Sequence, residues 1–413
     1  MLKVLHIVSG EFSGGAARGA YWLHSALLQH GVNSRIYSNA RLLPESQSIT
    51  SISSNNFGYL NSIINGKLDT LPLKFYRKKQ NSTFDPALFG IDFTRSDEYP
   101  EADIIHLHWV NRGLLNIKDL SKVKKPIVWT MRDMWPMTGG CHYSMGCDEY
   151  KRKCGRCPQL SSNKQKDLSW YVLRRKMLNM PSDMKIVGIS HWLSNCAQQS
   201  AIFHDYKVET IHNGIDLEKF SPIDKSSAKE ILGLDENKST VIVGAQEINN
   251  YHKGFNHFIE AIKYIDTKNI QFLFFGFLDE SLLRETGIDY KYIGYLNDIL
   301  SMRLAYSSAD VCVFPSVMDA FGKVVIESLA CGTPVVVFDA TGPRDIIDHK
   351  IDGFKAKPFE ANDLAAGINW ILADKSRHAD LCLNARKKAV KSFDIKKIAN
   401  QYLDMYEDML AAS

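Results

Sequence analysis

The chain has 413 residues, of which 45% are hydrophobic and 23% are charged, and its formal net charge is +4. This composition and length are typical of a globular protein with two or three domains. No apolar run approaches the roughly 20 residues that a membrane-spanning helix needs. The N-terminal segment MLKVLHIVSG is too short for a secretory signal, so we expect a cytoplasmic chain.

Charge is distributed unevenly along the chain. Residues 1–185 hold 26 Lys and Arg against 15 Asp and Glu, whereas residues 186–413 hold 24 against 31. A basic half favours contact with an anionic substrate or surface. No basic-aromatic motif of nucleic-acid binding accompanies it, so we expect no nucleic-acid partner.

Short apolar strands alternate with helical patterns. The first pair is KVLHIVS (3–9) and AARGAYWLHSALLQHG (16–31), whose Ala20, Leu23 and Leu27 share one helical face. The further expected strands are 34–39, 102–110, 126–133 and 185–190, then 240–246, 270–277, 290–296, 310–317 and 334–340. This alternation predicts an α/β protein with two doubly wound parallel sheets, each covered on both faces.

The domain boundary is predicted after the segment ETIHNGID. Residues 1–217 would form an N-terminal Rossmann-like domain and residues 218–393 a C-terminal one. Residues 394–413 are predicted to form a helix that packs back on the first domain. Residues 53–70 show no clear period and are predicted to be a loop or an insertion. Ligands of such folds bind beyond the carboxyl ends of the strands.

The stretch PSVMDAFGKVVIESLACGTPVV (315–336) places Asp319 before a predicted helix and Glu327 inside it. The helix is expected to begin near Phe321 and Gly322, with amides that suit a diphosphate or sugar hydroxyls. Helical side chains lean toward the N-terminus, so Glu327 can reach the same crevice. Two carboxylates at a helix N-terminus suit a nucleotide sugar. The structural alternative is an N-terminal acid and a solvated helix residue.

Two further segments are compatible with phosphate binding. In EINNYHKGF, Lys253 before Gly254 would place a point charge on a phosphate. In SGEFSGGAARG, Gly14 and Gly15 follow the first strand, open a helix and would let the backbone approach a phosphate. The spacing is not G-x-G-x-x-G, so a dinucleotide is disfavoured. A tight turn without a ligand stays the alternative.

The spacing P-S-x-x-D-x-F-G-x-x-x-x-E-x-x-A-x-G-x-P-V-V, with HKGF and the N-terminal glycine pair, resembles retaining glycosyltransferases of the GT-B fold, family 4 or group 1. HLHWVNRGLL, WTMRDMWPMTGGCHY and the cysteine segment are similar to the branch that assembles colanic acid and other surface polysaccharides. The resemblance implies two domains with a cleft between them and no cofactor for catalysis. It implies hexose transfer from a nucleoside-diphosphate sugar, UDP before GDP, to an oligosaccharide or polyprenyl-diphosphate-linked acceptor of O-antigen, capsule or exopolysaccharide.

The resemblance also implies site residues. The donor would contact Gly14, Gly15, Gln246, Lys253, Ile293, Gly294, Asp319, Phe321, Gly322 and Glu327. Lys253 would neutralise the departing diphosphate, Glu327 would bind the ribose hydroxyls, and Asp319 would hold the sugar. The expected catalytic residues are Asp319, Lys253, His108 and Arg132.

Three positions depart from the family pattern. Asp319 stands where the family usually has Glu, Gln246 or His252 where it has Arg, and Arg132 where it has His. These departures keep a non-catalytic paralogue that binds a nucleotide sugar or glycan open as an alternative. A GT-B sugar-nucleotide epimerase is a further alternative.

Four cysteines fall in a cysteine-rich loop, residues 139–158, with the spacing C-x5-C-x6-C-x2-C: Cys141, Cys147, Cys154 and Cys157. The C-x2-C half matches common zinc spacing, and disulfides are disfavoured in the cytosol. One interpretation is that the loop binds a structural zinc, with His142 as a possible replacement for one cysteine ligand. The other is that the loop carries four reduced thiols. Both interpretations stay open.

Polar and aromatic residues lie at predicted strand ends of the first domain, namely His108, Trp109, Arg132, Asp133 and Tyr143. These residues suit the binding of a saccharide acceptor, with His108 or Asp133 as the base. The alternative is that they are structural polar residues. The segment DLSWYVLRRKMLNM (167–180) mixes aromatic and basic residues. It predicts a helix that lies peripherally on the anionic inner face of the cytoplasmic membrane, or a helix with its apolar face in the core.

Overall fold

The computed structural model describes residues 1–12, 14–41, 46–54, 56–76, 79–80 and 82–412. The chain forms two compact units. The first comprises Met1–His212 with Ile398–Ser413, and the second comprises Asn213–Lys397. The observed boundary precedes the position expected after residue 217 by a few residues. Among the described residues, no helix is both long and apolar enough to cross a membrane.

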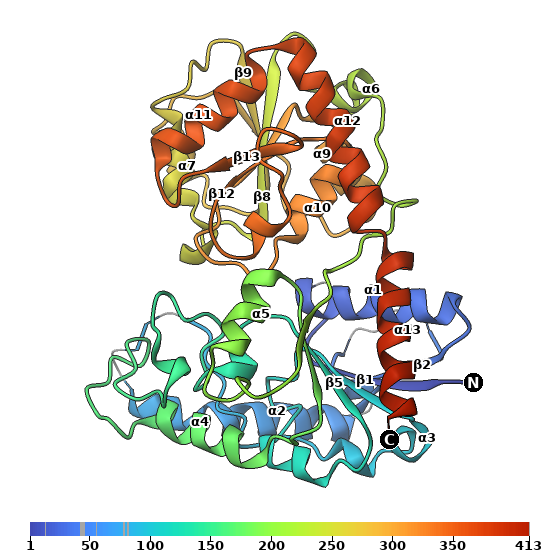
Figure 1. The fold of residues 1–413 in the computed structure, drawn as a ribbon. Coiled ribbons are helices and arrows are strands. Elements are labelled where there is room, and N and C mark those ends of the chain that lie inside the picture. The colour runs from blue at the N-terminus through green and yellow to red at the C-terminus, as the bar shows by residue number, and fades with distance from the viewer. Residues whose placement is uncertain (13, 42–45, 55, 77–78, 81, 413) are drawn as a thin grey trace. The chain divides into compact units, whose positions relative to one another are not determined.

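The first unit is built on a seven-stranded sheet in the order β3-β2-β1-β4-β5-β6-β7, with every neighbouring pair parallel (Figure 1). Its strands are β1 (Lys3–Val8), β2 (Asn33–Ser38), β3 (Ile49–Ser51), β4 (Ile104–Leu107), β5 (Ile127–Met131), β6 (Lys185–Gly188) and β7 (Val208–Thr210). Its helices are α1 (Gly15–Gln29), α2 (Asn56–Thr70), α3 (Glu98–Glu101), α4 (Leu168–Asn179), α5 (His191–Gln198) and most of α13 (Ile395–Ala411).

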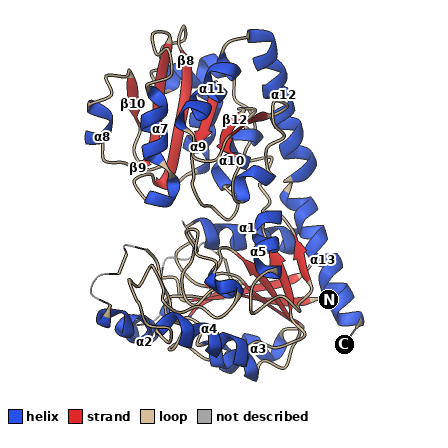
Figure 2. Cartoon of the chain, turned by 60° about the vertical axis from the view of Figure 1, so that its left-hand side comes forward, coloured by secondary structure: helices blue, strands red, loops and turns tan. Residues whose placement is uncertain are grey.

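The second unit has a six-stranded parallel sheet in the order β10-β9-β8-β11-β12-β13, with helices on both faces (Figure 2). Its strands are β8 (Ser239–Glu247), β9 (Ile270–Phe277), β10 (Tyr290–Tyr292), β11 (Val311–Phe314), β12 (Val335–Phe338) and β13 (Gly353–Ala356). Its helices are α6 (Lys225–Ile231), α7 (Phe255–Ile262), α8 (Ser281–Arg284), α9 (Ile299–Ser308), α10 (Lys323–Ala330), α11 (Ala361–Leu372) and α12 (Lys375–Ser392).

The apolar strands lie in the cores, and the predicted fold class is confirmed. In β9, every residue but the last is buried, as a parallel strand covered on both faces requires. The first helix also buries the expected face, because Ala20, Leu23 and Leu27 are buried in α1. The ten expected strands correspond to observed ones. The pattern missed β3, β7 and β13, which have three or four residues and form sheet edges.

The expected loop at residues 53–70 is wrong, because most of this stretch is the 15-residue helix α2. Asp69 is its buried residue, and its carboxylate accepts hydrogen bonds from the amides of Ala87, Leu88 and Phe89. The apolar side chains of α2 point instead to solvent. Helix α2 is held by the hydrogen bonds of one buried carboxylate, so it lacks the buried apolar stripe that sequence patterns detect.

Helix α13 supplies two tyrosines to the first unit. The hydroxyl of Tyr406 lies 2.6 Å from Nδ1 of His106 on β4, and that of Tyr402 lies 2.8 Å from the hydroxyl of Thr130 on β5. All four side chains are buried. Hydrogen bonds between buried polar groups therefore hold the C-terminal helix against this sheet.

Candidate functional site

In each sheet the strand order reverses at one point, between β1 and β4 in the first unit and between β8 and β11 in the second. Loops that leave the carboxyl ends of two such strands run in opposite directions, and ligands of open α/β sheets bind in the crevice between them. In the second unit these two loops carry Lys253 and Asp319, which lie 66 positions apart in the sequence.

The loops after β8 and β11 are clamped together by backbone contacts. The carbonyl of His252 accepts hydrogen bonds from the amide of Val317 at 2.9 Å and the hydroxyl of Ser316 at 2.8 Å. Gly254 has φ +69°, and a Cβ there would lie 1.9 Å from the carbonyl oxygen of Pro315. Glycine is therefore required after Lys253, because any other residue would push the two loops apart.

This clamp sets a close ion pair. Lys253 Nζ lies 2.7 Å from Asp319 Oδ2, and the side chains are only 23% and 13% exposed. Burial alone would raise the pKa of Asp319, but Lys253 and the amide of Phe321 outweigh it and hold that pKa below its usual value. Burial, with the charge of Lys253, lowers the pKa of His252 to about 4. At neutral pH the site therefore holds one cation, one anion and a neutral imidazole.

A third loop, after β12, completes the support of Asp319. The amide of Gly342 donates to the carbonyl of Asp319 at 2.9 Å, and the amide of Asp319 donates to the hydroxyl of Thr341 at 3.3 Å. Thr341 has φ +53° and ψ −155°, a sparsely populated conformation for a β-branched residue. Such strain persists where surrounding contacts over-determine the backbone, as they do at many binding sites.

The structure alters the expected roles of two residues around α10. The Phe321 amide, expected to be open to a ligand, donates to Asp319 Oδ1 at 3.0 Å. Gly322, with φ +96°, then precedes the first turn of α10. Glu327 is buried, and its Oε2 accepts the hydroxyl hydrogen of Tyr306 at 2.9 Å. The solvated-residue alternative for Glu327 is therefore wrong.

The remaining expected donor residues of this unit lie at carboxyl ends of strands. Gln246 is exposed near the end of β8. The amide of Ile293 donates to Phe274, and the carbonyl of Gly294 accepts from Gly276, so these two backbone groups serve the sheet. Sequence reasoning missed the stacked rings of Phe277 and Tyr295 beside them, whose centroids lie 4.8 Å apart. Only the aromatic ends of two expected strands could have signalled this pair.

In the first unit, the expected glycine pair lies at the start of α1. The amide of Gly14 donates to the carbonyl of Glu11, and α1 begins at Gly15. A Cβ at Gly15 would meet no atom of the described residues within 4 Å. The space beside this helix N-terminus is open to an approaching phosphate.

The loop after β5 and the segment before β4 hold a buried histidine between two carboxylates. His142 Nδ1 lies 2.6 Å from Asp133 Oδ2, and His142 Nε2 lies 2.8 Å from Asp85 Oδ2. Burial alone would lower the pKa of His142, but the two carboxylates raise it to about 9. His142 is therefore a cation at neutral pH. Both ring nitrogens are occupied, so it is not the replacement metal ligand considered above.

Asp133 is fully engaged and is not placed as the base expected from the sequence. Its Oδ1 accepts the amide of Trp135 at 2.8 Å, and its Oδ2 accepts Trp109 Nε1 at 2.9 Å in addition to His142. Asp133 therefore fixes the orientation of the Trp109 ring. Sequence reasoning missed Asp85, because it lies in a segment without periodicity.

His108 is likewise buried with both nitrogens engaged. Its Nδ1 lies 3.0 Å from a guanidinium nitrogen of Arg132, and its Nε2 lies 2.9 Å from Nδ1 of His6. Burial lowers its pKa well below 6.5, so the ring is neutral. We therefore assign His108 a positioning role for Arg132 and not the proton-accepting role expected from the sequence.

The ligand atoms of His6, His106 and His108 lie within 4.8 Å of one another. The electrostatics disfavour a metal ion there, because the buried Arg132 guanidinium bonds to the same cluster. His106 also has both nitrogens engaged, with Tyr406 and Thr130. This cluster is the polar core of the sheet.

Tyr143, expected near the acceptor, is half-buried, and its carbonyl accepts the side-chain amide of Gln159. Lys176, expected on a basic helix surface, is fully buried; its Nζ donates to the carbonyls of Trp135 and Thr138 and lies 3.5 Å from the Trp135 ring centroid. Arg174 and Tyr171 are the residues of α4 that point to solvent as expected.

The four loop cysteines are brought together at one cavity, whose lining includes Cys141, Cys147, Cys154 and Cys157. All four are free thiols. Burial raises the pKa of Cys141 to about 12 and also raises that of Cys154 and Cys157. The cavity therefore disfavours bare thiolates.

Two doubly wound parallel sheets, each with one strand-order reversal, define the class of the GT-B fold. Residues 224–388 match the family model "Glycosyl transferases group 1". Through this region the chain is similar to that family.

The chain is similar to three known proteins. It is 31% identical over 223 residues to UDP-Gal:alpha-D-GlcNAc-diphosphoundecaprenol alpha-1,3-galactosyltransferase of Escherichia coli, which covers 49% of this chain and 55% of that one. It is 22% identical over 81% of its length to a colanic acid biosynthesis glycosyl transferase of Escherichia coli (strain K12), covering 82% of it. Sucrose-phosphate synthase of Thermosynechococcus elongatus shares the fold over the whole of both chains, with a TM-score of 0.75 and 20% identity.

The extent of these alignments limits what they establish. Alignments with the relatives at 28–32% identity cover 53–67% of those proteins, so the chain spans about half to two thirds of their length. The likeness supports a glycosyltransferase of polysaccharide biosynthesis.

Proposed function

We propose that this glycosyltransferase moves a hexose from a UDP-sugar to a lipid-linked oligosaccharide, with retention of the anomeric configuration. The observation that carries the proposal is the Lys253–Asp319 pair at the β8/β11 reversal, held by three loops. The named donor and acceptor of the Escherichia coli galactosyltransferase support a uridine nucleotide and a diphospholipid acceptor.

The site chemistry follows from the charges. In the chain without ligand, Asp319 keeps the Lys253 ammonium in place. A bound diphosphate would offer that ammonium a second partner, while Asp319 would accept hydrogen bonds from sugar hydroxyls. As the bond between the sugar and the diphosphate breaks, negative charge grows on the departing phosphate, and a fixed cation stabilises it. Glu327, buried beside the start of α10, would hold the ribose hydroxyls.

Donor binding is the first test of this function. A ligand that binds the native state raises its unfolding temperature by mass action. We expect UDP-hexoses to raise the unfolding midpoint, GDP-hexoses to raise it less, and Glu327→Ala to abolish the shift. The matched control is Glu260→Ala on α7, an exposed acid of the same unit, which should leave the shift unchanged.

The product analysis separates the alternatives. Incubation with donor and a diphospholipid-linked sugar should yield an elongated lipid whose new bond keeps the donor configuration. An epimerised donor would show the epimerase, and a thermal shift with no turnover of any donor would show a non-catalytic paralogue. An inverted linkage would contradict retention alone.

We propose that the protein meets its acceptor at an anionic membrane surface through α2. Six large apolar side chains on α2 and the following 3-10 turn are exposed: Phe57, Leu60, Ile64, Leu68, Leu71 and Phe75. Their spacing of three or four residues puts them along one helical stripe. Lys67 and Lys74 are exposed beside it, whereas the acid of this segment, Asp69, is buried. An apolar stripe with flanking lysines suits a membrane interface.

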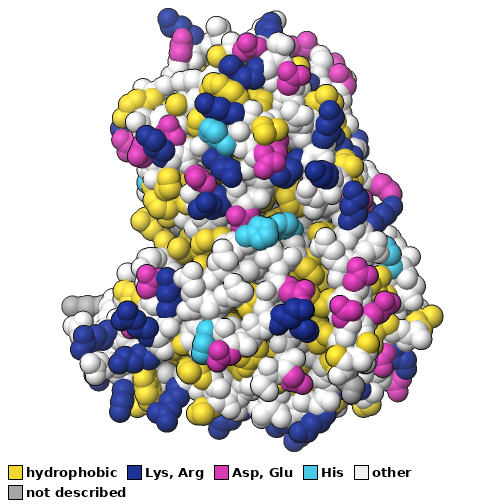
Figure 3. All heavy atoms as spheres, viewed as in Figure 1, with side chains coloured by type: hydrophobic (Ala, Val, Ile, Leu, Met, Phe, Trp, Pro, Cys, Tyr) yellow, Lys and Arg dark blue, Asp and Glu magenta, His cyan; other side chains and the backbone are white. Residues whose placement is uncertain are grey.

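The rest of the first unit adds positive charge. Figure 3 shows Lys and Arg side chains gathered at the left margin of its lower part, where the loop between β5 and α4 lies in Figure 1. The exposed basic residues of this loop are Arg152, Lys153, Arg156, Lys164 and Lys166. Each basic residue near an anionic surface contributes about 1 kcal/mol of attraction.

A triple variant tests this surface. We expect Leu60→Glu, Ile64→Glu and Leu68→Glu together to lower co-sedimentation with vesicles of about one-third anionic lipid at least tenfold, because the stripe then carries charge of the same sign as the lipid. The control is Ile231→Glu with Leu300→Glu, which alters two exposed apolar residues of the second unit. Unchanged vesicle binding by the triple variant would show that the protein contacts the membrane through a surface other than α2.

A further inference from the structure

The loop between β5 and α4 is unusually long for a compact domain. It runs from residue 132 to residue 167 and contains only two 3-10 turns, Trp135–Met137 and Glu149–Lys151. Loops longer than about 12–15 residues without their own secondary structure are uncommon unless they serve a function. Interactions other than those of a helix or strand must therefore hold this loop in its conformation.

The backbone of this loop bends sharply at the cysteines. Cys154, Gly155 and Arg156 are three consecutive residues with positive φ, of +50°, +103° and +47°, and they lead directly to Cys157. Met145 and Gly146 have φ of +49° and +84° and lead to Cys147. Left-handed backbone is unfavourable for residues other than glycine, so both turns are maintained against a conformational cost to deliver a cysteine to the cavity.

Neighbouring groups also hold the cysteines in place. A Cβ at Gly139 would lie 3.0 Å from the sulfur of Cys154, so the backbone of Gly139 lies directly against that sulfur. The amide of Cys157 donates to Asp167 Oδ2 at 2.8 Å. Outer-shell contacts of this kind orient metal-bound ligands.

The charge of the surroundings complements a metal–thiolate group. A zinc ion with four thiolate ligands carries a net negative charge. Lys176 reaches this region from α4, and its amino group is fully buried. Its hydrogen-bond acceptors are the neutral carbonyls of Trp135 and Thr138. A buried charge is tolerated where an opposite charge lies near it.

We propose that Cys141, Cys147, Cys154 and Cys157 bind one structural zinc ion, and that this ion holds His142 between Asp85 and Asp133. Each thiol would release its proton to solvent as its sulfur bonds to the metal. Four protein ligands leave no open position, so the ion takes no part in the reaction. The proposal is independent of the donor and acceptor proposed above.

Binding requires an inward movement of the cysteines. Among the described residues, no three of these sulfurs lie within 4.8 Å of one another, as the atoms of the buried histidine cluster do. Zinc–sulfur bonds of about 2.3 Å would draw the sulfurs together at the existing cavity. The hydrogen bond from the amide of Met134 to the carbonyl of His142, at 3.0 Å, then connects the cysteine turn to the loop end that carries Asp133.

The test begins with metal content. The full chain, purified under reductant without chelator or metal-affinity resin, should hold about one zinc per chain. Cys147→Ser and Cys157→Ser should each lose most of it, whereas Cys382→Ser, outside the loop, should keep it. Cobalt added to chelator-treated protein should give the absorption of a tetrahedral thiolate site. The absence of both zinc and this cobalt spectrum in the wild-type chain would overturn the proposal.

Hydrogen exchange then tests the positioning of His142. Removal of zinc from the wild-type protein should increase amide exchange across residues 133–157 and leave β8 and β11 unchanged. This comparison needs no variant, so misfolding of a cysteine substitution cannot obscure it. Unchanged exchange at residues 133–143 would limit the role of the metal to the cysteines themselves and overturn its link to His142.

Discussion

Lys253→Met is expected to lower kcat by about 10²–10³-fold, the usual effect of removing one group that stabilises charge in a transition state. In the chain without ligand, Lys253 is bonded to Asp319, and donor binding would add a diphosphate partner. The charge on this diphosphate is greatest when the bond to the sugar has broken. Donor affinity should therefore fall much less than kcat, because only interactions that strengthen in the transition state accelerate the chemical step.

The measurement pairs single-turnover release of UDP with a donor-binding titration. Lys238→Met is the matched control, because Lys238 forms a similar 2.8 Å ion pair with Asp289 in the same unit at a solvent-exposed position. It should leave kcat and affinity unchanged. An equal loss of affinity and kcat/KM in Lys253→Met, with kcat unchanged, would restrict Lys253 to ground-state binding.

The same residues show how far the sequence could lead. Alternating apolar strands and helices predict two parallel sheets, because only a sheet covered on both faces needs strands as uniformly buried as β9. The HKGF and PSVMDAFG segments predict Lys253 and Asp319 as one site, since both follow strands. The pairing itself, and the need for glycine at Gly254 to bring the Pro315 carbonyl close, become evident only in three dimensions.

The positions where the sequence left two interpretations open share a physical origin. Lys176 looks like part of a basic surface, and only the buried Trp135 ring and two carbonyls show that it faces inward. His108 and Asp133 carry the side chains of a base, but their lone pairs and protons are already used by neighbours distant in sequence. Local patterns report residue types and periods. They do not report which hydrogen bonds are already satisfied.

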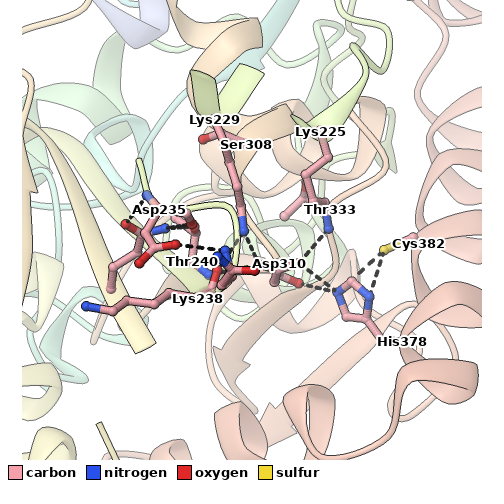
Figure 4. A network of polar contacts seen from close by, with 12 residues as sticks. Lys225, Lys229, Asp235, Lys238, Thr240, Ser308, Asp310, Thr333, His378 and Cys382 are labelled. Atoms are coloured by element: carbon pink, nitrogen blue, oxygen red, sulfur yellow. Dashed lines mark hydrogen bonds and ion pairs between the residues drawn. The ribbon is translucent and has the colours of Figure 1, made fainter. Parts of the chain in front are cut away.

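Asp310→Asn is expected to lower the free energy of unfolding by about 3–5 kcal/mol, as removing one partner of a buried ion pair does. Asp310 lies at the amino end of β11, opposite the edge that carries Asp319. Figure 4 shows it surrounded by Lys225, Lys229, Thr240 and His378. Its Oδ1 lies 2.6 Å from Lys225 Nζ, and its Oδ2 accepts the amide of Thr240 at 2.8 Å.

The pH dependence of this loss follows from the pKa of Asp310. Burial alone would raise this pKa, but Lys225, the Thr240 amide and Lys229 outweigh it, so the folded-state value lies below the usual one. The stabilisation is therefore fully present above the unfolded pKa of about 3.9 and is lost as the pH falls through the folded value. The difference in unfolding free energy between wild type and Asp310→Asn should be constant above about pH 5 and should narrow below about pH 4.

Chemical unfolding monitored at several pH values measures this difference. Asp289→Asn is the control, because Asp289 forms its ion pair with Lys238 while 57% exposed. Its loss should change stability by no more than about 1 kcal/mol. A buried cluster at the amino edge of the sheet joins α6, β8, β11 and α12 through one carboxylate, so its removal should weaken the second unit without changing kcat of the folded fraction. An equal effect of the two substitutions would show that water reaches Asp310 and that its four partners add little.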